Sequence, residues 1–211
     1  SLTIMGAVSP PGADFSEPVT QATLRIIRAL YALDVDLAYR RHYPAINWLI
    51  SYSLYVDNVT GWWHTGVDPE WRSMRERALA ILQREAELAE LVRLVGVEAL
   101  PEEDKLLLEV ARMIREDFLR QDAFHEIDCF CPPRKAALMM RAIMMFYEYG
   151  LKAVKAGIPV EKLRSLKCVP RIARMKEIPN IDFEGEFKDL FEEIKKEFDE
   201  LFREVEVLAK A

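Results

Sequence analysis

The sequence predicts a mainly α-helical protein, in which a single strand and a proline-rich loop precede a C-terminal antiparallel helical bundle. Apolar residues recur three and four positions apart in four long segments after residue 66, as on the buried face of a helix. Proline or glycine marks the ends of these segments, where such residues start and stop helices. One stretch, residues 2–8, has the unbroken apolar character of a buried strand.

The first part of the chain combines this strand with a loop. Residues 2–8 read LTIMGAV, which suits a strand buried on both faces of a parallel sheet. No second strand of similar quality follows, so we expect the chain to be cut from a longer protein that holds the rest of the sheet. Residues 9–18 contain three prolines and a glycine, which block both helix and sheet, and are therefore expected to form a loop.

A helix is expected next, with Thr20 as its N-cap and the basic residues 40–42 at its end, just before Pro44. Residues 45–66 are rich in tryptophan and tyrosine and are expected to be irregular. The apolar stripe of the predicted helix consists of Leu24, Ile27, Tyr31 and Ala38.

Residues 67–211 form the predicted bundle domain, and residues 1–66 are assigned to a separate unit before it. Asp68 is expected to cap the first bundle helix, which ends at Gly96. Pro101 and Pro132-Pro133 open the next two helices, and a last helix follows near the end of the chain. The apolar faces include Met74, Ala78, Ile81, Leu88, Val110, Ile114, Met140, Met144, Phe187, Ile194, Phe198 and Leu201.

Composition narrows the classes of partner. The net charge of −6, from 35 acidic and 29 basic residues, disfavours nucleic acid. Three cysteines, an odd number, disfavour a secreted disulfide framework. No apolar run reaches the roughly 20 residues that span a bilayer, so we expect no direct membrane insertion. No signal peptide is expected either, because the first residues lack a basic segment.

The sequence offers little chemistry of its own. None of the eight glycines precedes a lysine and no two have GxG spacing, so neither a phosphate-binding loop nor a dinucleotide fingerprint is present. Cys129, Cys131 and His125, with Cys168 as a distant fourth ligand, leave a metal or redox site open as an alternative. We favour buried thiols or a loop that binds no metal, because a one-residue spacing is not the usual spacing of zinc ligands. No metal site and no catalytic residue is assigned.

Two further features have competing interpretations. The acidic run at residues 98–104 lies at a turn between two helices, where carboxylates favour the helix dipole and are commonly only solvated. Tyr43, Phe124 and Phe130 lie next to loop residues, where aromatic rings either anchor the core or stack on a flat ligand. Composition alone favours the solvated run and the core rings.

Residues 3–21 (TIMGAVSPPGADFSEPVTQ) resemble a signature of the catalytic A subunit of archaeal A-type and vacuolar-type rotary ATP synthases. The resemblance covers essentially the whole chain and fades after about residue 178. It implies that the strand and loop are the remnant of a truncated α/β nucleotide-binding domain. Further matching segments are residues 32–34 (ALD), 40–49 (RRHYPAINWL), 51–55 (SYSLY), 68–71 (DPEW) and 121–124 (QDAF).

The resemblance implies a role for the three aromatic residues. By similarity to the related F-type β subunit, Tyr43 matches the aromatic that stacks on adenine, and Phe124 and Phe130 match two further rings of that pocket. ATP or ADP with Mg is the cofactor that this implies for the full-length subunit. The family's phosphate-binding lysine and Mg ligands lie before Ser1, so we expect the chain alone to bind no cofactor and to be inactive.

The resemblance also implies contacts with a rotor. Residues 96–105 (GVEALPEEDK), here called the acidic turn, resemble a lever that presses on the central stalk, although Ala99 and Pro101 depart from the F-type pattern. The predicted contact residues of the acidic turn are Glu98, Glu102, Glu103 and Asp104. A second rotor contact is implied for the loop that contains Asp14, Ser16 and Glu17.

The implied partners are B subunits, in an alternating A3B3 hexamer, and the subunits of the central stalk. The complex would lie on the cytoplasmic face of the membrane and couple ATP synthesis or hydrolysis to the transport of ions such as hydrogen ions. Nucleotide would close the upstream domain on the bundle through the adenine pocket, and the bundle would swing against an eccentric shaft. The alternative function is an independent helical scaffold without catalytic activity. Because apolar surface would be left exposed, a homodimer of the chain is also expected.

Overall fold

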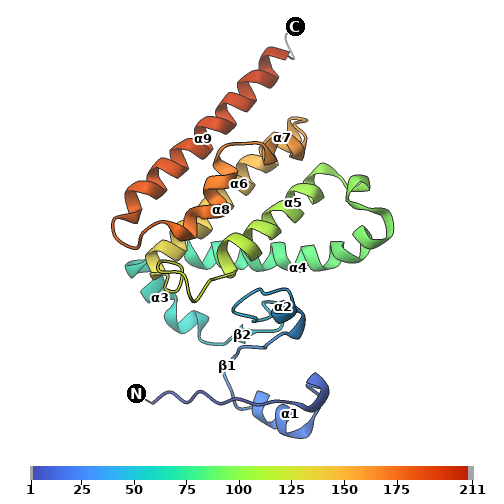
Figure 1. The fold of residues 1–211 in the computed structure, drawn as a ribbon, viewed down its shortest axis with the longest axis vertical. Helices are drawn as coiled ribbons and strands as arrows, with labels where there is room; N and C mark the ends of the chain where they lie inside the picture. The colour runs from blue at the N-terminus through green and yellow to red at the C-terminus, as the bar shows by residue number, and fades with distance from the viewer. Residues whose placement is uncertain (1, 209–211) are drawn as a thin grey trace.

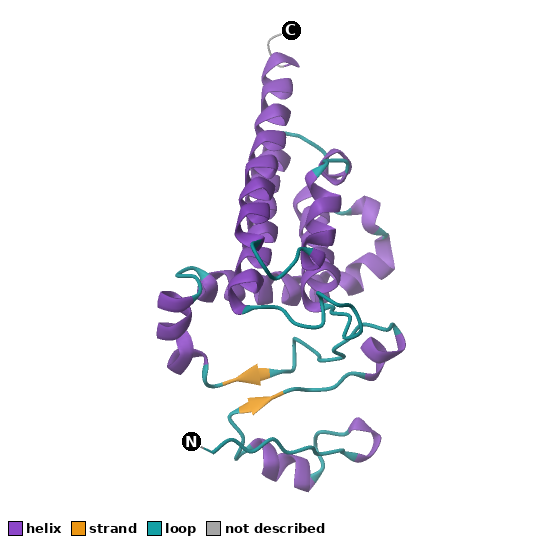
Figure 2. Ribbon diagram, turned by 60° about the vertical axis from the view of Figure 1, so that its left-hand side comes forward, coloured by secondary structure: helices purple, strands orange, loops and turns teal. Residues whose placement is uncertain are grey.

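The computed structural model describes residues 2–208 and contains mainly helices, as the sequence predicts (Figure 1). The N-terminal segment lies at one end of the molecule and the last helix at the other. A small two-stranded sheet lies between the N-terminal segment and the helical part (Figure 2). Among the described residues, no helix is both long enough and apolar enough to cross a membrane.

The strand predicted at residues 2–8 is not formed. This stretch is irregular and its side chains are exposed, Leu2, Ile4 and Met5 among them. A strand is stabilised by hydrogen bonds to a neighbouring strand, and within residues 2–208 none pairs with this stretch. A short 3₁₀ turn, η1 (Pro11–Ala13), follows it.

The helix predicted from Thr20 to His42 is broken into two. Helix α1 (Pro18–Leu24) is capped by the Glu17 carboxylate, which accepts the Thr20 amide at 2.7 Å. Helix α2 (Val35–Tyr39) is capped by Asp34. Strand β1 (Ala29–Leu30) lies between them and pairs antiparallel with β2 (Tyr52–Ser53). The break arises because Asp34 starts a new helix and β1 has a partner distant in sequence.

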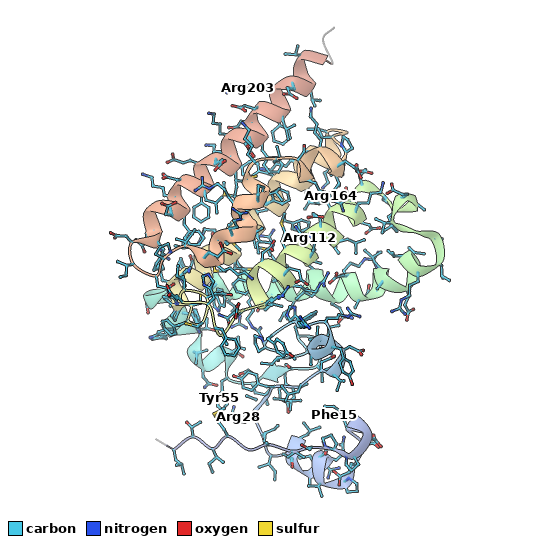
Figure 3. All side chains as sticks on the ribbon, viewed as in Figure 1. Phe15, Arg28, Tyr55, Arg112, Arg164 and Arg203 are labelled. Carbon is cyan, nitrogen blue, oxygen red and sulfur yellow. The ribbon has the colours of Figure 1, made fainter. Side chains whose placement is uncertain are left out.

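The segment predicted as irregular contains β2 and also helix α3 (Val56–Gly66). Two interactions hold this region. The guanidinium of Arg28 lies 5.0 Å from the ring centre of Tyr55, at the side of the sheet (Figure 3). The rings of Trp63 and Trp71 stack with centres 4.7 Å apart, which fixes α3 to the start of the next helix.

A helical hairpin begins the bundle. Helix α4 (Trp71–Val95) ends at Gly96, whose φ of +81° favours glycine, and a 3₁₀ turn, η2 (Val97–Ala99), follows. Helix α5 (Glu102–Arg112) returns along α4 and continues as a π-helical segment, η3 (Met113–Leu119). The predicted cap Asp68 is not the N-cap residue of α4, which is Glu70, but its Oδ1 accepts the Glu70 amide at 2.9 Å. The buried Asp68 carboxylate also accepts two hydrogen bonds from Arg141.

The second half of the bundle contains two helices that the apolar spacing does not predict. Helix α6 (Pro133–Lys155) is followed by α7 (Val160–Arg164), α8 (Cys168–Arg174), a 3₁₀ turn η4 (Met175–Glu177) and α9 (Phe183–Leu208). Because α7 and α8 return along the bundle, α9 runs parallel to α6 rather than antiparallel (Figure 1). Arg134 accordingly pairs with Glu184 at the start of α9, and Lys162 of α7 with Glu204 near its end.

The core lies between α4, α5, α6 and α9. Gly150 of α6 lets α5 approach closely, since a Cβ there would lie 2.9 Å from the Leu106 Cδ1. Phe198 of α9 packs edge-on against Phe146 and stacks on Tyr149, both from α6. The buried Glu109 carboxylate joins Arg112 of α5 to Arg164 of α7 (Figure 3). These contacts join α5, α6, α7 and α9 into one packed unit.

Candidate functional site

The three aromatic residues predicted to stack on a ligand are exposed, not buried in the core. Tyr43, Phe124 and Phe130 have relative exposures of 52%, 98% and 64%. Tyr43 follows α2, while the two phenylalanines lie in residues 121–132, here called the aromatic loop, between η3 and α6. The alternative that these rings are core anchors is therefore wrong.

A backbone hydrogen bond joins the two segments that carry these rings. The Gln121 amide donates to the Tyr43 carbonyl over 2.7 Å. Residues almost eighty positions apart in sequence are thereby brought to one place, at the first residue of the aromatic loop. The hydrogen bond holds the two backbone segments together, and so sets the backbone positions from which the exposed rings extend.

The aromatic loop is held by its own polar groups. Asp128 is buried, and its carboxylate accepts the Asp122 amide at 2.7 Å. The Nδ1 of His125 accepts the amides of Ile127 and Asp128, each at 3.2 Å. Because these bonds already order the loop, Phe124 would bind a flat ligand with little further loss of conformational entropy.

A buried histidine lies beside Tyr43. The ring of His42 is 5.5 Å from that of Trp48, and its Nδ1 is 4.0 Å from Glu116 of η3. Burial lowers the pKa of His42, and the nearby Glu116 only partly opposes this effect. The imidazole is thus favoured in its neutral form, beside the Trp48 ring.

The exposed rings of Tyr43, Phe124 and Phe130 are suited to stacking on a nucleobase. Exposed ring faces stack on a nucleobase through dispersion, at about 1–3 kcal/mol for each base, and do so without reading its edges. The resemblance in sequence includes Gln121, within residues 121–124, but gives it no positioning role, and it does not include Asp128. The partners of these two residues are set by tertiary structure, which no local sequence pattern records.

The acidic turn forms the tip of the α4–α5 hairpin, at the right-hand edge of Figure 1. Its acids are not equivalent. The Glu98 side chain is 94% exposed, and Glu103 is exposed as well. Glu102 instead accepts a hydrogen bond from Lys105 at 2.8 Å and from the Val160 amide of α7 at 2.8 Å. Asp104 lies 4.0 Å from Arg84 of α4.

These contacts assign different tasks to the acids. The hydrogen bond from Lys105, reinforced by the Val160 amide, lowers the pKa of Glu102. Glu102 therefore ties the tip to α7, whereas Glu98 and Glu103 are available to a partner. Apolar side chains are exposed beside them at the same tip: Leu91, Leu94, Val95 and Val97.

The acids of the N-terminal loop are engaged locally. The Asp14 carboxylate accepts the Ser16 amide at 2.9 Å, and Glu17 caps α1. Hydrogen bonds from Ser16 lower the pKa of Asp14, and the bond from the Thr20 amide lowers that of Glu17. The loop is thus a compact turn with ionised carboxylates on its surface.

The three cysteines do not gather. Cys129 is exposed, Cys131 is half-buried with its Sγ 3.9 Å from the Met139 Sδ, and Cys168 is buried in the core. Within residues 2–208, no three His, Cys, Asp or Glu side chains are placed to hold a metal ion together. The proposed ligand His125 already accepts two backbone amides through Nδ1.

Comparisons with known proteins agree with these features. Residues 1–53 match the ATP synthase alpha/beta family, nucleotide-binding domain, and residues 60–164 match the C-terminal domain of V and A type ATP synthase. The chain is 78% identical over 210 residues to the A subunit of the A-type ATP synthase of Staphylothermus marinus, covering 100% of this chain and 36% of that protein. It is 56% identical over 205 residues to that of Methanopyrus kandleri, covering 97% and 34%. The chain thus spans about a third of the length of these relatives.

Proposed function

This chain belongs to the family of A-type ATP synthase A subunits, matching their C-terminal portion, and we propose that it supplies the adenine-stacking wall and the rotor-contacting lever of such a protein. The observation that carries the proposal is the 2.7 Å hydrogen bond from Gln121 to Tyr43, which joins the segments that hold the exposed rings. The independent scaffold is not favoured, because the similarity to these subunits extends over the full chain.

The adenine wall consists of Tyr43, Phe124 and Phe130. In the complete subunit these rings hold the base of ATP or ADP, while Mg, bound to the phosphates, neutralises their charge. The chain has no glycine-lysine phosphate loop. It is therefore inactive by itself, and robust ATP turnover by the pure chain would contradict this part of the proposal.

The wall is tested in the complete A subunit with Tyr43→Ala. Loss of one stacking ring should weaken ATP binding about tenfold or more, since stacking contributes about 1–3 kcal/mol for each base. Tyr39→Ala is the matched control, because Tyr39 is also an exposed tyrosine of this region. Unchanged ATP affinity in a folded Tyr43→Ala protein would mean that the ring does not touch the base.

The lever is the acidic turn, which presses on the central stalk. Glu98 and Glu103 make the contact, with the exposed apolar side chains of the tip around them, while Glu102 and Asp104 keep the tip rigid. The N-terminal loop with Asp14, Ser16 and Glu17 is a second rotor contact, through the surface of its compact turn.

The lever is tested by comparing two variants of the complete complex. Glu98→Gln with Glu103→Gln should change stalk affinity or torque and leave the melting temperature of the subunit unchanged, because both side chains are exposed. Glu102→Gln should lower the melting temperature, since its carboxylate holds the Val160 amide. If the exposed pair alters neither stalk binding nor torque, the lever proposal is wrong.

The remaining partners are proposed from the similarity to A-type ATP synthase A subunits. B subunits alternate with A subunits in an A3B3 hexamer, and the complex lies on the cytoplasmic face of the membrane, where it couples ATP synthesis or hydrolysis to ion transport. Apolar side chains exposed in the first part of the chain, such as Ile26, Tyr31 and Leu33, favour self-association of the isolated chain. Sedimentation of the pure chain tests this homodimer.

A further inference from the structure

Lys135 is a buried lysine that the proposed function does not use. It stands in the first turn of α6 and is only 1% exposed. Its ammonium donates to three oxygens that carry no charge: the carbonyls of Lys176 and Ile178, at 2.8 and 2.6 Å, and the Oδ1 of Asn180, at 3.0 Å. An ammonium has three donors, so all of them are satisfied.

Burying this ammonium is costly, and burial lowers the pKa of Lys135. A methionine of similar volume would fill the same space without that cost. The three bonds connect the start of α6 to the segment between η4 and α9, and the two carbonyls belong to the end of η4 and the turn that follows. The lysine therefore fixes where this segment lies.

Asn180 links Lys135 to the aromatic loop through hydrogen bonds. Because a lysine only donates hydrogen bonds, Asn180 must present its Oδ1 to Lys135, and its Nδ2 must face the other way. That Nδ2 donates to the carbonyl of Phe130 at 2.8 Å and to that of Ile127 at 3.4 Å. Both acceptors belong to the aromatic loop. Lys135 thus sets the orientation of the amide that holds the loop.

We propose that Lys135 and Asn180 form a latch that positions the aromatic loop for stacking on adenine. This inference rests on the proposed function of Phe124 and Phe130. Neither latch residue touches the base; both are positioning residues, acting through the backbone of Phe130. The loop is then fixed at both ends, by Gln121 on Tyr43 and by Asn180 on Phe130.

The test measures two affinities in the complete A subunit, one for ATP and one for inorganic tripolyphosphate, which has no base. Lys135→Met should weaken ATP binding about fivefold or more, because a displaced loop loses stacking on the base, and leave tripolyphosphate binding unchanged. Asn180→Asp keeps an acceptor for Lys135 but loses the donor to Phe130, and should have the same selective effect. Lys188→Met, an exposed lysine of α9, is the matched control and should bind both ligands normally.

The outcomes separate the latch from the wall. Should Lys135→Met fail to fold, Asn180→Asp decides. The latch is overturned if the folded variants bind ATP normally, or if they lose both ligands equally, as general destabilisation would cause. Phe124→Ala is measured alongside. If it weakens ATP binding and the latch variants do not, the latch alone is wrong; if Phe124→Ala also has no effect, both proposals fail.

Discussion

Replacing Phe198 by alanine should strongly destabilise the bundle. The ring is fully buried, lies 5.5 Å edge-on from Phe146 and is stacked 5.4 Å from Tyr149. Removing a buried phenylalanine costs about 3–5 kcal/mol, from lost transfer free energy and the cavity that remains. Because two aromatic pairs are also lost, the expected cost is not at the lower end of that range but about 4 kcal/mol.

The assay is chemical denaturation of the chain followed by circular dichroism. For a protein of this size, about 4 kcal/mol also lowers the melting temperature by about 8–16 °C. Phe202→Ala is the matched control, because Phe202 is only partly buried and its ring centre lies 6.4 Å from that of Phe198. A loss below about 1 kcal/mol for Phe198→Ala, or one no larger than for the control, would refute the packing of α9 on α6.

Two further predictions concern the fold. Gly150→Ala should destabilise the chain by about 1–3 kcal/mol, because its Cβ would lie 2.9 Å from Leu106. Gly185→Ala is the control: it has open space around it in α9 and should be neutral or stabilising by up to about 1 kcal/mol. Equal effects of the two substitutions on chemical denaturation would contradict the close approach of α5 and α6. Burial raises the pKa of Asp117, whose Oδ2 has no hydrogen-bond partner within the described residues, so its ionised form is unfavourable in the fold. Asp117→Asn should therefore raise the melting temperature at neutral pH. This gain should vanish as the pH falls through the raised pKa to the ordinary pKa of an aspartate, because the side chain is then protonated in both the folded and the unfolded state. A gain in melting temperature that does not depend on pH would contradict the reasoning.

The long helices were predictable because their signals are local. The apolar spacing in α4, α6 and α9 extends over many turns, and Gly96 and Pro133 mark boundaries by their own backbone preferences. The break between α1 and α2 was missed because Leu30 pairs with Tyr52, a contact that no local window contains. The parallel direction of α9 was missed for a related reason, since α7 and α8 are too short to show a period.

The candidate site shows the same limit. The resemblance in sequence selected Tyr43, Phe124 and Phe130, but it could not indicate that the rings are exposed or that Gln121 joins their segments. It selected Glu98 and Glu102 equally, although the Glu98 side chain is 94% exposed and the Glu102 carboxylate holds the Val160 amide. These differences depend on tertiary contacts between groups far apart along the chain.

Photolabelling tests the central claim most directly. The complete A subunit is irradiated with an ATP analogue that carries an azido group on its adenine ring, and the labelled peptides are identified by mass spectrometry. Label is predicted on Tyr43 or within the aromatic loop, and excess ATP should prevent it. The claim that these 211 residues supply the wall that holds adenine would be contradicted by one result. In that result, the labelling that excess ATP suppresses lies entirely outside this chain, and neither Tyr43 nor residues 121–132 are labelled.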